Sequence, residues 1–531
     1  MKMRSRHSDP RSPAAIREVR FRLLILVLIG ATTPLGSQAP TFSNPVIPGD
    51  HPDPSLVRVG DEYWATATTS QWAPIFPLLR SRDLVRWTLE GAVFQEPPAW
   101  SSGSYWAPEI TEHAGTLFVY YTARRKNGPL CVAVATAAKP SGPWTDHGPL
   151  VCQEVGSIDA VAVTGESGQR YLVWKEDGNS RKLPTPLWAQ PLSADGTSLT
   201  GQPTEILRNE APWEGHLIEG PFILRRDSWF YLFYSAGACC GRKCDYRLGV
   251  ARARNILGPW ERNPANPILR ANEHWKCPGH GSLVTTAEGR TFLLYHAYHP
   301  KDFEYAGRQA LLDEVIWQHG WPTINGGRGP SAQPRVPAGE TAPPPAVLDE
   351  FAASRLDPRW QWPWDRAPDR SLREGVLTVR AAGRDAADPA DTIVGQPAIT
   401  GDYTATVRVM RPSQAGAFAG LSVYGNAANA IGLSLSGARA VLWRREKNAH
   451  RIVATVPAPS NDWVILRVTA TGGSKFQFAL SADGRTWQSI SPVESAAYLP
   501  PWDLAVRVAL AVGGPAGSEG RFDRIRIEYG R

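Results

Sequence analysis

The chain has 531 residues, more than one hydrophobic core usually serves, so we expect at least two domains. Its 21 Trp, 48 Gly and 47 Pro favour short strands joined by tight turns over long helices. The formal net charge is +7, but residues 1–39 hold seven Lys/Arg and two acids and so contribute +5, which leaves +2. A net charge this close to zero does not indicate a surface that binds polyanions. We therefore expect no nucleic-acid partner.

Residues 1–39 read as a secretory signal peptide. A basic segment precedes the apolar run Leu23–Ile29, and Ser37-Gln38-Ala39 suits signal peptidase. The apolar run is too short to span a bilayer comfortably, although the long basic segment leaves an uncleaved anchor as the alternative. We therefore expect a secreted or periplasmic protein that meets no membrane apart from its signal peptide.

The run Gly49-Asp50-His51-Pro52-Asp53-Pro54-Ser55 opens the mature chain just before a strand-like segment. Pro52 and Pro54 fix their own φ and push the preceding residues toward extended backbone. Asp53 is therefore held stiffly, as a positioned catalytic or binding group needs to be. The alternative interpretation is an ordinary turn aspartate before a strand.

Similar polar or aromatic anchors recur from residue 48 to 330, each followed by runs of aromatic and aliphatic residues. The anchors are Asp53, Trp106, Asp159, Glu219 and His280, which lie 53, 53, 60 and 61 residues apart. Four strands with their turns take roughly 40–50 residues per propeller blade, so the spacing predicts five blades with generous loops. Innermost strands converge on the axis, which would bring the anchors together. The alternative is a β-sandwich with accidental spacing.

The rest of the chain predicts a second all-β domain. Residues 331–346 are proline-rich and indicate a semi-rigid linker after a propeller domain at 43–330. Residues 347–531 contain eight or more evenly spaced strand candidates, which suggests a β-sandwich. The predicted fold class is all-β: a five-bladed β-propeller followed by a β-sandwich.

The six cysteines fit an exported protein, in which disulfides are permitted. The cluster of Cys239, Cys240 and Cys244 could form a local bridge that closes a loop. A zinc site is the rival interpretation, but no histidine lies nearby at ligand spacing.

Three of the five anchors are acids, namely Asp53, Asp159 and Glu219. Glycoside hydrolysis needs one carboxylic acid to protonate the leaving oxygen and one carboxylate opposite it, which activates water in inverting enzymes. A third acid can raise the pKa of the general acid by like-charge repulsion and orient it. Taken singly, each acid is more often a turn or surface residue.

With these motifs in order, residues 43–320 resemble glycoside hydrolase family 43. The matching motifs are His-Pro-Asp-Pro-Ser at Asp53, Trp-Ala-Pro-Glu-Ile at Trp106, Ser-Ile-Asp-Ala at Asp159, Ile-Glu-Gly-Pro at Glu219 and Gly-His-Gly-Ser at His280. The resemblance implies a five-bladed propeller in which Asp53 is the general base, Glu219 the general acid and Asp159 the pKa modulator. It also implies that Trp106 and Arg308 bind substrate.

The resemblance carries two further expectations. His280 is similar to a histidine that often ligates a calcium ion or its water near the propeller axis, and the alternative is a buried, hydrogen-bonded histidine. Apart from this structural calcium no cofactor is expected. The segment that begins Leu348-Asp349-Glu350-Phe351 resembles the concanavalin A-like, jelly-roll sandwich that follows the propeller in β-xylosidases of the family. The related invertases and levansucrases carry Asn-Asp-Pro-Asn and Arg-Asp-Pro motifs, which this sequence lacks.

We therefore predict a secreted inverting glycoside hydrolase that removes terminal pentoses, as β-D-xylosides or α-L-arabinofuranosides, from plant-type poly- or oligosaccharides. The alternatives within the fold are an endo-arabinanase or another exo-glycosidase such as a galactosidase. A carbohydrate-binding propeller without catalysis is a second class, which the presence of all three acids disfavours. A structural or adhesion protein that uses the sandwich is a third.

Overall fold

The computed structural model describes residues 42–301, 303–332, 346–500 and 502–530. The predicted signal peptide at 1–39 and most of the predicted linker at 331–346 lie outside these residues. The helical elements of the described part are short: α1 (Phe303–Ala306) and the 3-10 helices η1 (Gly178–Arg181), η2 (Pro212–Glu214) and η3 (Asn325–Gly327). None of these described helices is long and apolar enough to cross a lipid bilayer.

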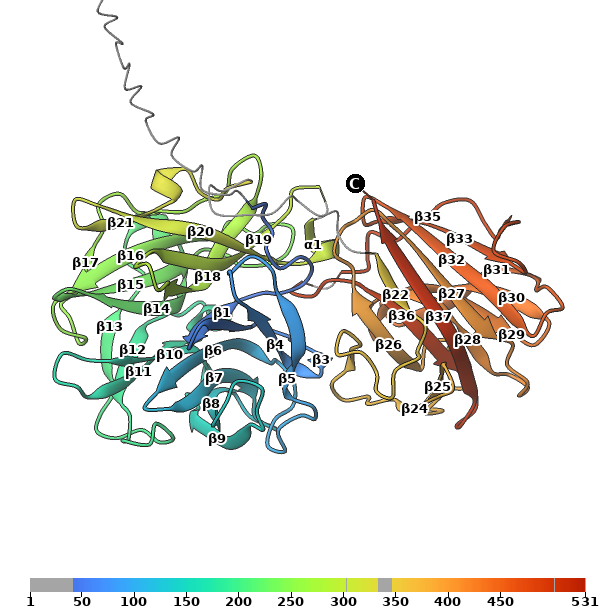
Figure 1. Ribbon diagram of the computed structural model, residues 1–531, viewed down its shortest axis with the longest axis horizontal. Helices are drawn as coiled ribbons and strands as arrows, with labels where there is room; N and C mark the ends of the chain where they lie inside the picture. The colour runs from blue at the N-terminus through green and yellow to red at the C-terminus, as the bar shows by residue number, and fades with distance from the viewer. Residues whose placement is uncertain (1–41, 302, 333–345, 501, 531) are drawn as a thin grey trace, which may run out of the picture. The chain divides into compact units, whose positions relative to one another are not determined.

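The first half of the described chain forms five sheets, each of four antiparallel strands paired in chain order (Figure 1). Their strands are β1 (Ser55–Val59), β2 (Glu62–Thr66), β4 (Ile75–Ser81) and β5 (Thr88–Phe94); β6 (Trp106–His113), β7 (Thr116–Arg124), β8 (Leu130–Ala137) and β9 (Thr145–Val151); β10 (Ser157–Thr164), β11 (Arg170–Glu176), β12 (Leu187–Pro191) and β13 (Thr204–Leu207); β14 (Ile218–Arg226), β15 (Trp229–Ala236), β16 (Arg247–Ala253) and β17 (Glu261–Arg262); and β18 (Lys276–Thr285), β19 (Thr291–Tyr298), β20 (Gln309–Gln318) and β21 (Trp321–Ile324).

These five sheets are the blades of a closed propeller. The first strands of successive blades contact one another in the order β1, β6, β10, β14 and β18, and β18 returns to contact β1. The segment before β1 closes the ring on the fifth blade, where the backbone N–H of Val46 donates to the carbonyl of Ala310 (3.0 Å). The predicted five-bladed propeller is confirmed.

A hydrophobic core fills each space between neighbouring blades. Along β15, Phe230, Leu232 and Tyr234 pack toward the third blade, whereas Tyr231 and Phe233 pack toward the fifth. Alternate side chains of a strand point to opposite faces, and both faces of a blade are covered. The middle strands therefore read as almost unbroken aromatic and aliphatic runs.

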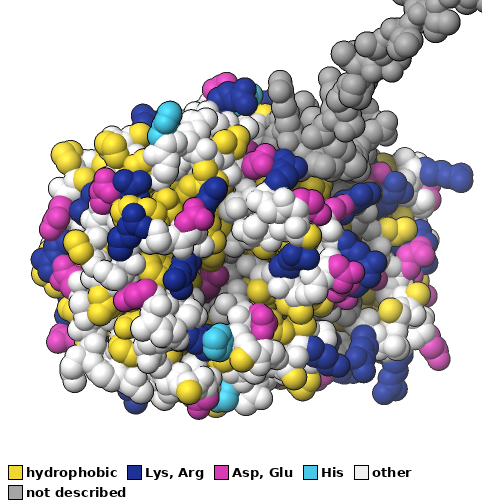
Figure 2. Space-filling model, turned by 60° about the vertical axis from the view of Figure 1, so that its left-hand side comes forward, with side chains coloured by type: hydrophobic (Ala, Val, Ile, Leu, Met, Phe, Trp, Pro, Cys, Tyr) yellow, Lys and Arg dark blue, Asp and Glu magenta, His cyan; other side chains and the backbone are white. Residues whose placement is uncertain are grey.

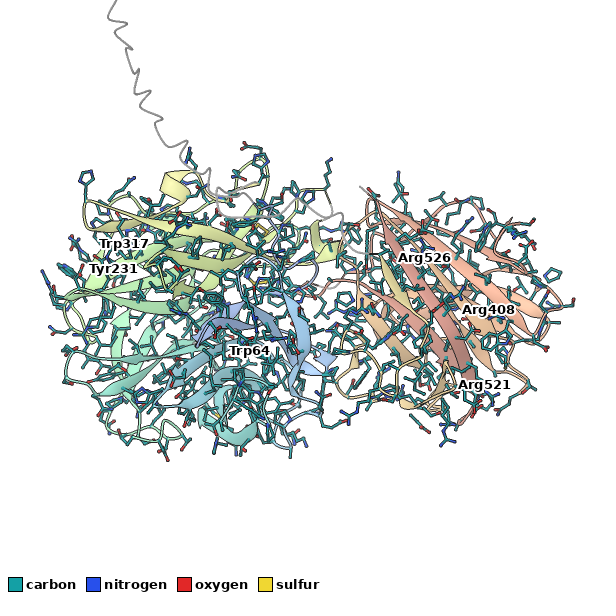
Figure 3. The ribbon with its side chains drawn as sticks, viewed as in Figure 1. Trp64, Tyr231, Trp317, Arg408, Arg521 and Arg526 are labelled. Carbon is teal, nitrogen blue, oxygen red and sulfur yellow. A yellow bond between two sulfur atoms is a disulfide. The ribbon has the colours of Figure 1, made fainter. Side chains whose placement is uncertain are left out.

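The same packing continues at the outer strands of the blades. Tyr231 and Trp317 meet edge to face with their ring centroids 4.6 Å apart (Figure 3). The guanidinium of Arg226 lies 4.4 Å from the centre of the Trp317 ring. Aromatic and cation–π contacts of this kind stabilise blades whose outer strands are only partly buried.

The inner strands are irregular at the positions where the sequence places its anchors. Pairing slips between Trp106 and Glu109, between Ile158 and Val161, and between Glu219 and Phe222. Left-handed φ angles occur at each anchor or directly after it, at Asp53 (49°), Ala107 (43°), Asp159 (58°), Gly220 (57°) and His280 (39°). Bulges and left-handed residues re-aim side chains, and all five anchors line one cavity.

The second half of the described chain is a sandwich of two antiparallel sheets. One contains β22 (Val347–Asp349), β24 (Asp369–Arg373), β25 (Val376–Arg380), β27 (Tyr403–Met410), β32 (Trp463–Thr471), β33 (Lys475–Ser481), β34 (Gln488–Ser489), β35 (Glu494–Ser495) and β37 (Glu519–Tyr529). The other contains β26 (Thr392–Pro397), β28 (Phe418–Asn426), β29 (Asn429–Ser436), β30 (Arg439–Glu446), β31 (Ala449–Pro457) and β36 (Arg507–Gly513).

Alternation along the strands places the core of the sandwich between its sheets. In β37, Phe522, Ile525 and Ile527 are fully buried, whereas Arg521 and Arg526, each next to one of them in sequence, are exposed. Figure 3 labels these two arginines on the sheet that also carries Arg408. The predicted β-sandwich is confirmed.

The two halves contact one another through backbone and buried charge. The short strands β3 (Trp72–Ala73) and β23 (Trp362–Pro363) pair across the boundary. Nη1 of Arg507 donates to Oδ2 of Asp50 at 3.1 Å, and both side chains are almost fully buried. A buried ion pair fixes orientation because separating its partners would leave an uncompensated charge.

Candidate active site

All six residues that the sequence singles out line one cavity of about 750 Å³. They are Asp53, Trp106, Asp159, Glu219, His280 and Arg308. Asp53 lies just before the inner strand of the first blade, the next four lie on the inner strands of the other blades, and Arg308 directly precedes β20. The three acids are each 7–8% exposed, so each carboxylate depends on protein partners to offset the loss of water.

Asp53 is surrounded by donors. Nη1 of Arg308 donates to Oδ1 at 2.9 Å, and the hydroxyl of Thr68 donates to Oδ2 at 2.7 Å. The Thr68 hydroxyl also accepts the N–H of Ala107 (2.7 Å), so it is fixed by the next blade. Burial alone would raise the pKa of Asp53, but Arg308 and His280 hold it well below its usual range. Asp53 is therefore ionised at neutral pH.

A second histidine, His296, contacts the backbone of Asp53. His296 is fully buried, and its Nδ1 accepts the backbone N–H of Asp53 at 3.1 Å. An accepting Nδ1 carries no proton, so the ring is neutral. Burial lowers the pKa of His296 to about 4, in agreement with a neutral ring at pH 7.

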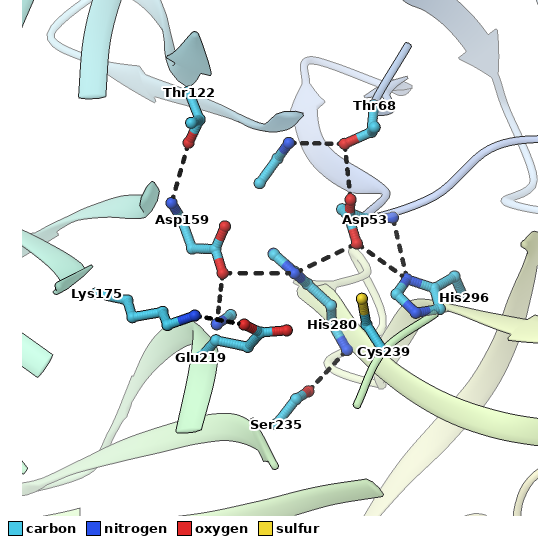
Figure 4. A network of polar contacts seen from close by, with 12 residues as sticks. Asp53, Thr68, Thr122, Asp159, Lys175, Glu219, Ser235, Cys239, His280 and His296 are labelled. Atoms are coloured by element: carbon cyan, nitrogen blue, oxygen red, sulfur yellow. Dashed lines mark hydrogen bonds and ion pairs between the residues drawn. The ribbon is translucent and has the colours of Figure 1, made fainter. Parts of the chain in front are cut away.

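His280 bridges two of the acids. Its Nδ1 lies 3.4 Å from Oδ1 of Asp53 and 4.0 Å from Oδ2 of Asp159 (Figure 4). Oδ2 of Asp159 also accepts the N–H of Gly220 at 3.0 Å, which orients the strand that carries the neighbouring Glu219. Gly220 is required here because a Cβ would lie 2.8 Å from the His280 ring. The network thus links four blades around His280.

Glu219 is held by a buried cation. Nζ of Lys175 donates to Oε2 of Glu219 at 2.7 Å and to Asp177 and Asn179 at 2.9 Å each (Figure 4 shows the first contact). The hydroxyl of Tyr246 donates to the other oxygen, Oε1, at 2.9 Å. All three protons of the ammonium group thus have acceptors, and both oxygens of Glu219 have donors.

The pKa values of the neighbouring acids Asp159 and Glu219 are shifted in opposite directions. Burial raises the pKa of Asp159 to about 7, with repulsion from Glu219 adding to the effect and His280 opposing it. Burial would likewise raise the pKa of Glu219, but Lys175 lowers it below its usual value. Asp159 therefore keeps its proton to higher pH than Glu219 does. The sequence predicts that Asp159 keeps Glu219 protonated, whereas Lys175 favours the charged form of Glu219.

Several residues at this site were not found from the sequence. Lys175 ends a buried strand, and a lysine at the end of the run Tyr171-Leu-Val-Trp was the available signal. Trp502 and Asp503 of the sandwich also line the cavity, and Ser70 donates to Asp503 at 3.1 Å. No local pattern marks these two residues, because only the packing of the sandwich on the propeller brings them to the cavity.

The calcium ion expected at His280 stays a prediction. The described residues contain no group of three or more His, Cys, Asp or Glu side chains arranged to hold a metal ion. Calcium prefers six to eight oxygen ligands, whereas Nδ1 of His280 is already engaged between two carboxylates. We derive no step through a metal ion.

The cysteines are paired differently from a simple loop closure. Cys239 is bonded to the adjacent Cys240, whereas Cys244 is bonded to Cys277 on β18. The third disulfide joins Cys131 to Cys152. Cys244 therefore ties the cluster to the next blade instead of closing the cluster on itself, and the alternative of a zinc site among these cysteines is excluded.

Charged side chains of both signs lie on the face of the described molecule that Figure 2 draws. Figure 2 shows Lys/Arg and Asp/Glu side chains interspersed over the face that it draws, without a broad region of one sign. A nucleic-acid-binding surface would gather basic side chains into a stripe or patch.

Three buried carboxyls in one cavity are the groups that acid–base hydrolysis of a glycosidic bond needs. The sequence model described as glycosyl hydrolases family 43 matches residues 42–322, more than half of the chain. A second, described as the beta xylosidase C-terminal concanavalin A-like domain, matches residues 348–501. The chain belongs to glycosyl hydrolases family 43 and is a glycoside hydrolase.

Individual relatives agree with this assignment. The chain is 30% identical over 328 residues to a xylan 1,3-beta-xylosidase of a Vibrio species, covering 56% of this chain and 60% of that protein. It is 27% identical over 495 residues to xylosidase/arabinosidase 43B of Humicola insolens, covering 86% and 89%. The crystal structure of the GH43 protein BlXynB from Bacillus licheniformis superposes with a TM-score of 0.81 at 26% identity, covering 92% and 100%.

Proposed function

We propose that this protein is a secreted or periplasmic, inverting exo-glycosidase that removes terminal pentoses, β-D-xylosyl or α-L-arabinofuranosyl, from plant-type poly- or oligosaccharides. The similar Vibrio protein is described as a xylosidase, and the Humicola protein as a xylosidase/arabinosidase. A relative from Bacteroides ovatus that is 28% identical over 487 residues is described as a non-reducing end alpha-L-arabinofuranosidase. The reaction needs no cofactor, because the carboxyls supply both acid and base.

One observation carries the proposal. Asp53 and Glu219 belong to the first and fourth blades, and the inner strands β1 and β14 are separated by β18 on one side and by β6 and β10 on the other. The two carboxyls therefore approach the cavity from different sides. An inverting glycosidase needs this arrangement, because water attacks the face of the sugar opposite the leaving group.

Each carboxyl then has one role. Asp53, ionised beside Arg308, accepts a proton from water as the water oxygen attacks the anomeric carbon. Glu219, when it holds the proton that it shares with Asp159, donates it to the leaving oxygen as the glycosidic bond breaks. The products are the free pentose and the shortened saccharide. Solvent then restores the proton to the acid pair and removes one from Asp53.

The remaining predicted residues bind substrate in this proposal. Trp106 offers an aromatic face to the sugar, and Arg308 can donate to a hydroxyl while it holds Asp53. Trp502, which is 62% exposed, and Asp503 place part of the sandwich at the same cavity. We propose that the second domain limits which saccharide chains can enter.

A hydrolysis screen tests the substrate class. We expect turnover of nitrophenyl β-D-xyloside or α-L-arabinofuranoside and release of single pentoses from the matching oligosaccharide. Nitrophenyl galactoside should be inert, and linear arabinan should not be cut internally. Asp53→Ala is the control for contaminating activity. Internal cleavage of arabinan, or turnover of the galactoside alone, would contradict the proposal.

The localisation is a separate part of the proposal. All six cysteines are paired in disulfides, which form and persist in oxidising compartments. Cell fractionation with N-terminal sequencing should find the protein outside the cytoplasm, beginning near Pro40. A cytoplasmic protein with free thiols and an intact N-terminus would contradict it.

A further inference from the structure

The loop of residues 237–246 joins β15 to β16 and brings a disulfide to the cavity. Cys239 and Cys240, which are adjacent in sequence, are bonded to one another, and both line the cavity that contains Asp53 and Glu219. Cys240 is only 5% exposed and Cys239 is half-buried. Figure 4 draws Cys239 in the same frame as the acids and His280. No step of the proposed reaction uses this pair.

The loop is held firmly at both ends. Oδ1 of Asp245 accepts the N–H of Ala238 at 2.7 Å, and the N–H of Asp245 donates to the carbonyl of Ala238 at 3.1 Å. The second disulfide, from Cys244 to Cys277, fastens the loop to β18, the strand that carries His280. The position of the adjacent pair relative to the acids is therefore fixed by covalent bonds and hydrogen bonds. Pre-organisation of this kind is what a binding group needs.

The chemistry of the pair contrasts with that of its surroundings. The other central groups of the cavity are ionisable: three carboxyls with Lys175 and Arg308. Two bonded sulfurs offer no hydrogen-bond donor and form a compact, stiff and apolar surface. A pentose ring has hydroxyl groups at its edge and C–H groups on its faces. An apolar surface among charged partners therefore favours the sugar orientation that turns a C–H face toward it.

We propose that the Cys239–Cys240 disulfide is a sugar-contacting surface of the substrate pocket, against which the C–H face of the bound pentose packs. It stands on the fourth blade, whereas Trp106 stands on the second, so apolar surfaces lie on separate walls of the cavity. This inference rests on the proposed pentosidase function. It assigns the disulfide to binding and orientation, not to proton transfer.

The kinetic test replaces both cysteines by serine, which keeps the size but removes the bond and adds two hydroxyls. Cys239→Ser with Cys240→Ser should raise KM for the nitrophenyl pentoside about tenfold and raise the inhibition constant of the free pentose in parallel, with kcat within twofold. The matched control is Cys131→Ala with Cys152→Ala, which removes a disulfide that does not line the cavity. The control should leave KM unchanged.

A second variant separates contact with sugar from an effect through the acid. Tyr246 is the last residue of the same loop and donates to Glu219, so Tyr246→Phe should change kcat and the pH profile and leave KM nearly unchanged. A serine double variant that reproduces the Tyr246→Phe pattern would overturn the proposal. So would a KM and an inhibition constant that stay within twofold of the wild type.

A measurement on the unmodified protein decides the matter even if the variant does not fold. D-xylose or L-arabinose should slow reduction of Cys239–Cys240 by tris(2-carboxyethyl)phosphine, followed by alkylation and peptide mass spectrometry, and leave Cys131–Cys152 unaffected. Equal rates with and without the sugar would overturn the proposal. If the wild type cleaves no pentoside, the proposed function is wrong, whatever the disulfide does. The same protection experiment is then done with the sugar that the protein releases from the glycoside it does cleave.

Discussion

Nζ of Lys175 lies 2.7 Å from Oε2 of Glu219, and both side chains are buried beside Asp159. The lysine makes the charged form of Glu219 favourable, whereas Asp159 takes the proton with its pKa raised by burial to about 7. The proposed general acid thus begins deprotonated. Its protonation depends on the balance between one neighbouring acid and one neighbouring cation.

Lys175→Met should shift that balance toward Glu219. Without the cation, burial raises the pKa of Glu219, so the acid form persists to higher pH. The alkaline limb of the kcat/KM profile should move upward by about 1–3 pH units, the usual effect of one close charge. Lys175→Arg keeps the charge and serves as the control. An alkaline limb that does not move in Lys175→Met would contradict the role of the lysine.

Asp159→Asn should move the same limb in the opposite direction. The substitution preserves shape and removes the group whose pKa is raised to about 7, which leaves Glu219 with Lys175 still beside it. Deprotonation of the acid then occurs at lower pH, and activity at pH 7 falls. Because the two carboxyls titrate together, the limb reports the pair and not a single residue. A wild-type rate with an unmoved limb would show that Asp159 takes no part.

Asp53 and Glu219 should differ in their response to the leaving group. Glu219→Ala should cost about 10²–10⁴-fold in kcat on xylobiose or an arabino-oligosaccharide, which need a proton on the leaving oxygen. It should cost far less on a dinitrophenyl pentoside, whose leaving group needs none. Asp53→Ala should abolish turnover of both. Equal losses for Glu219→Ala on the two substrates would remove it from the role of general acid.

Arg507 should be important for stability. Its partner Asp50 is also buried, and the guanidinium donates to Gln361 at 2.9 Å as well. Arg507→Met would leave Asp50 without its cation at the contact between the two halves of the chain, at a cost of about 3–5 kcal/mol in the free energy of unfolding. Calorimetry should show a lower Tm. Arg526→Met, at an exposed pair, is the control and should change Tm little.

The sequence predicted the propeller because the blades repeat. Asp53, Trp106, Asp159, Glu219 and His280 recur at similar spacing. The middle strands between them are apolar on both faces because each blade packs against a neighbour on either side. Even spacing and convergence of inner strands were enough to bring these five residues to one cavity. The sandwich was predicted in the same way, from the regular spacing of its strand candidates.

The sequence could not supply what depends on contacts between distant segments. Lys175 acts on Glu219 from the neighbouring blade, and Trp502 reaches the cavity from the other domain. The bonding of Cys239 to its neighbour also depends on the path of one loop and on the partner that Cys244 finds on β18. These contacts set the pKa values and the pocket wall, and no local pattern encodes them.

The stereochemistry of hydrolysis tests the central claim most directly. Proton NMR during turnover of nitrophenyl β-D-xyloside should show α-xylose as the first product, with β-xylose appearing only later by mutarotation. That result follows if Asp53 directs water to the face opposite the leaving group. Initial formation of β-xylose would mean retention through a covalent intermediate, and it would contradict the assignment of Asp53 as a base that activates water.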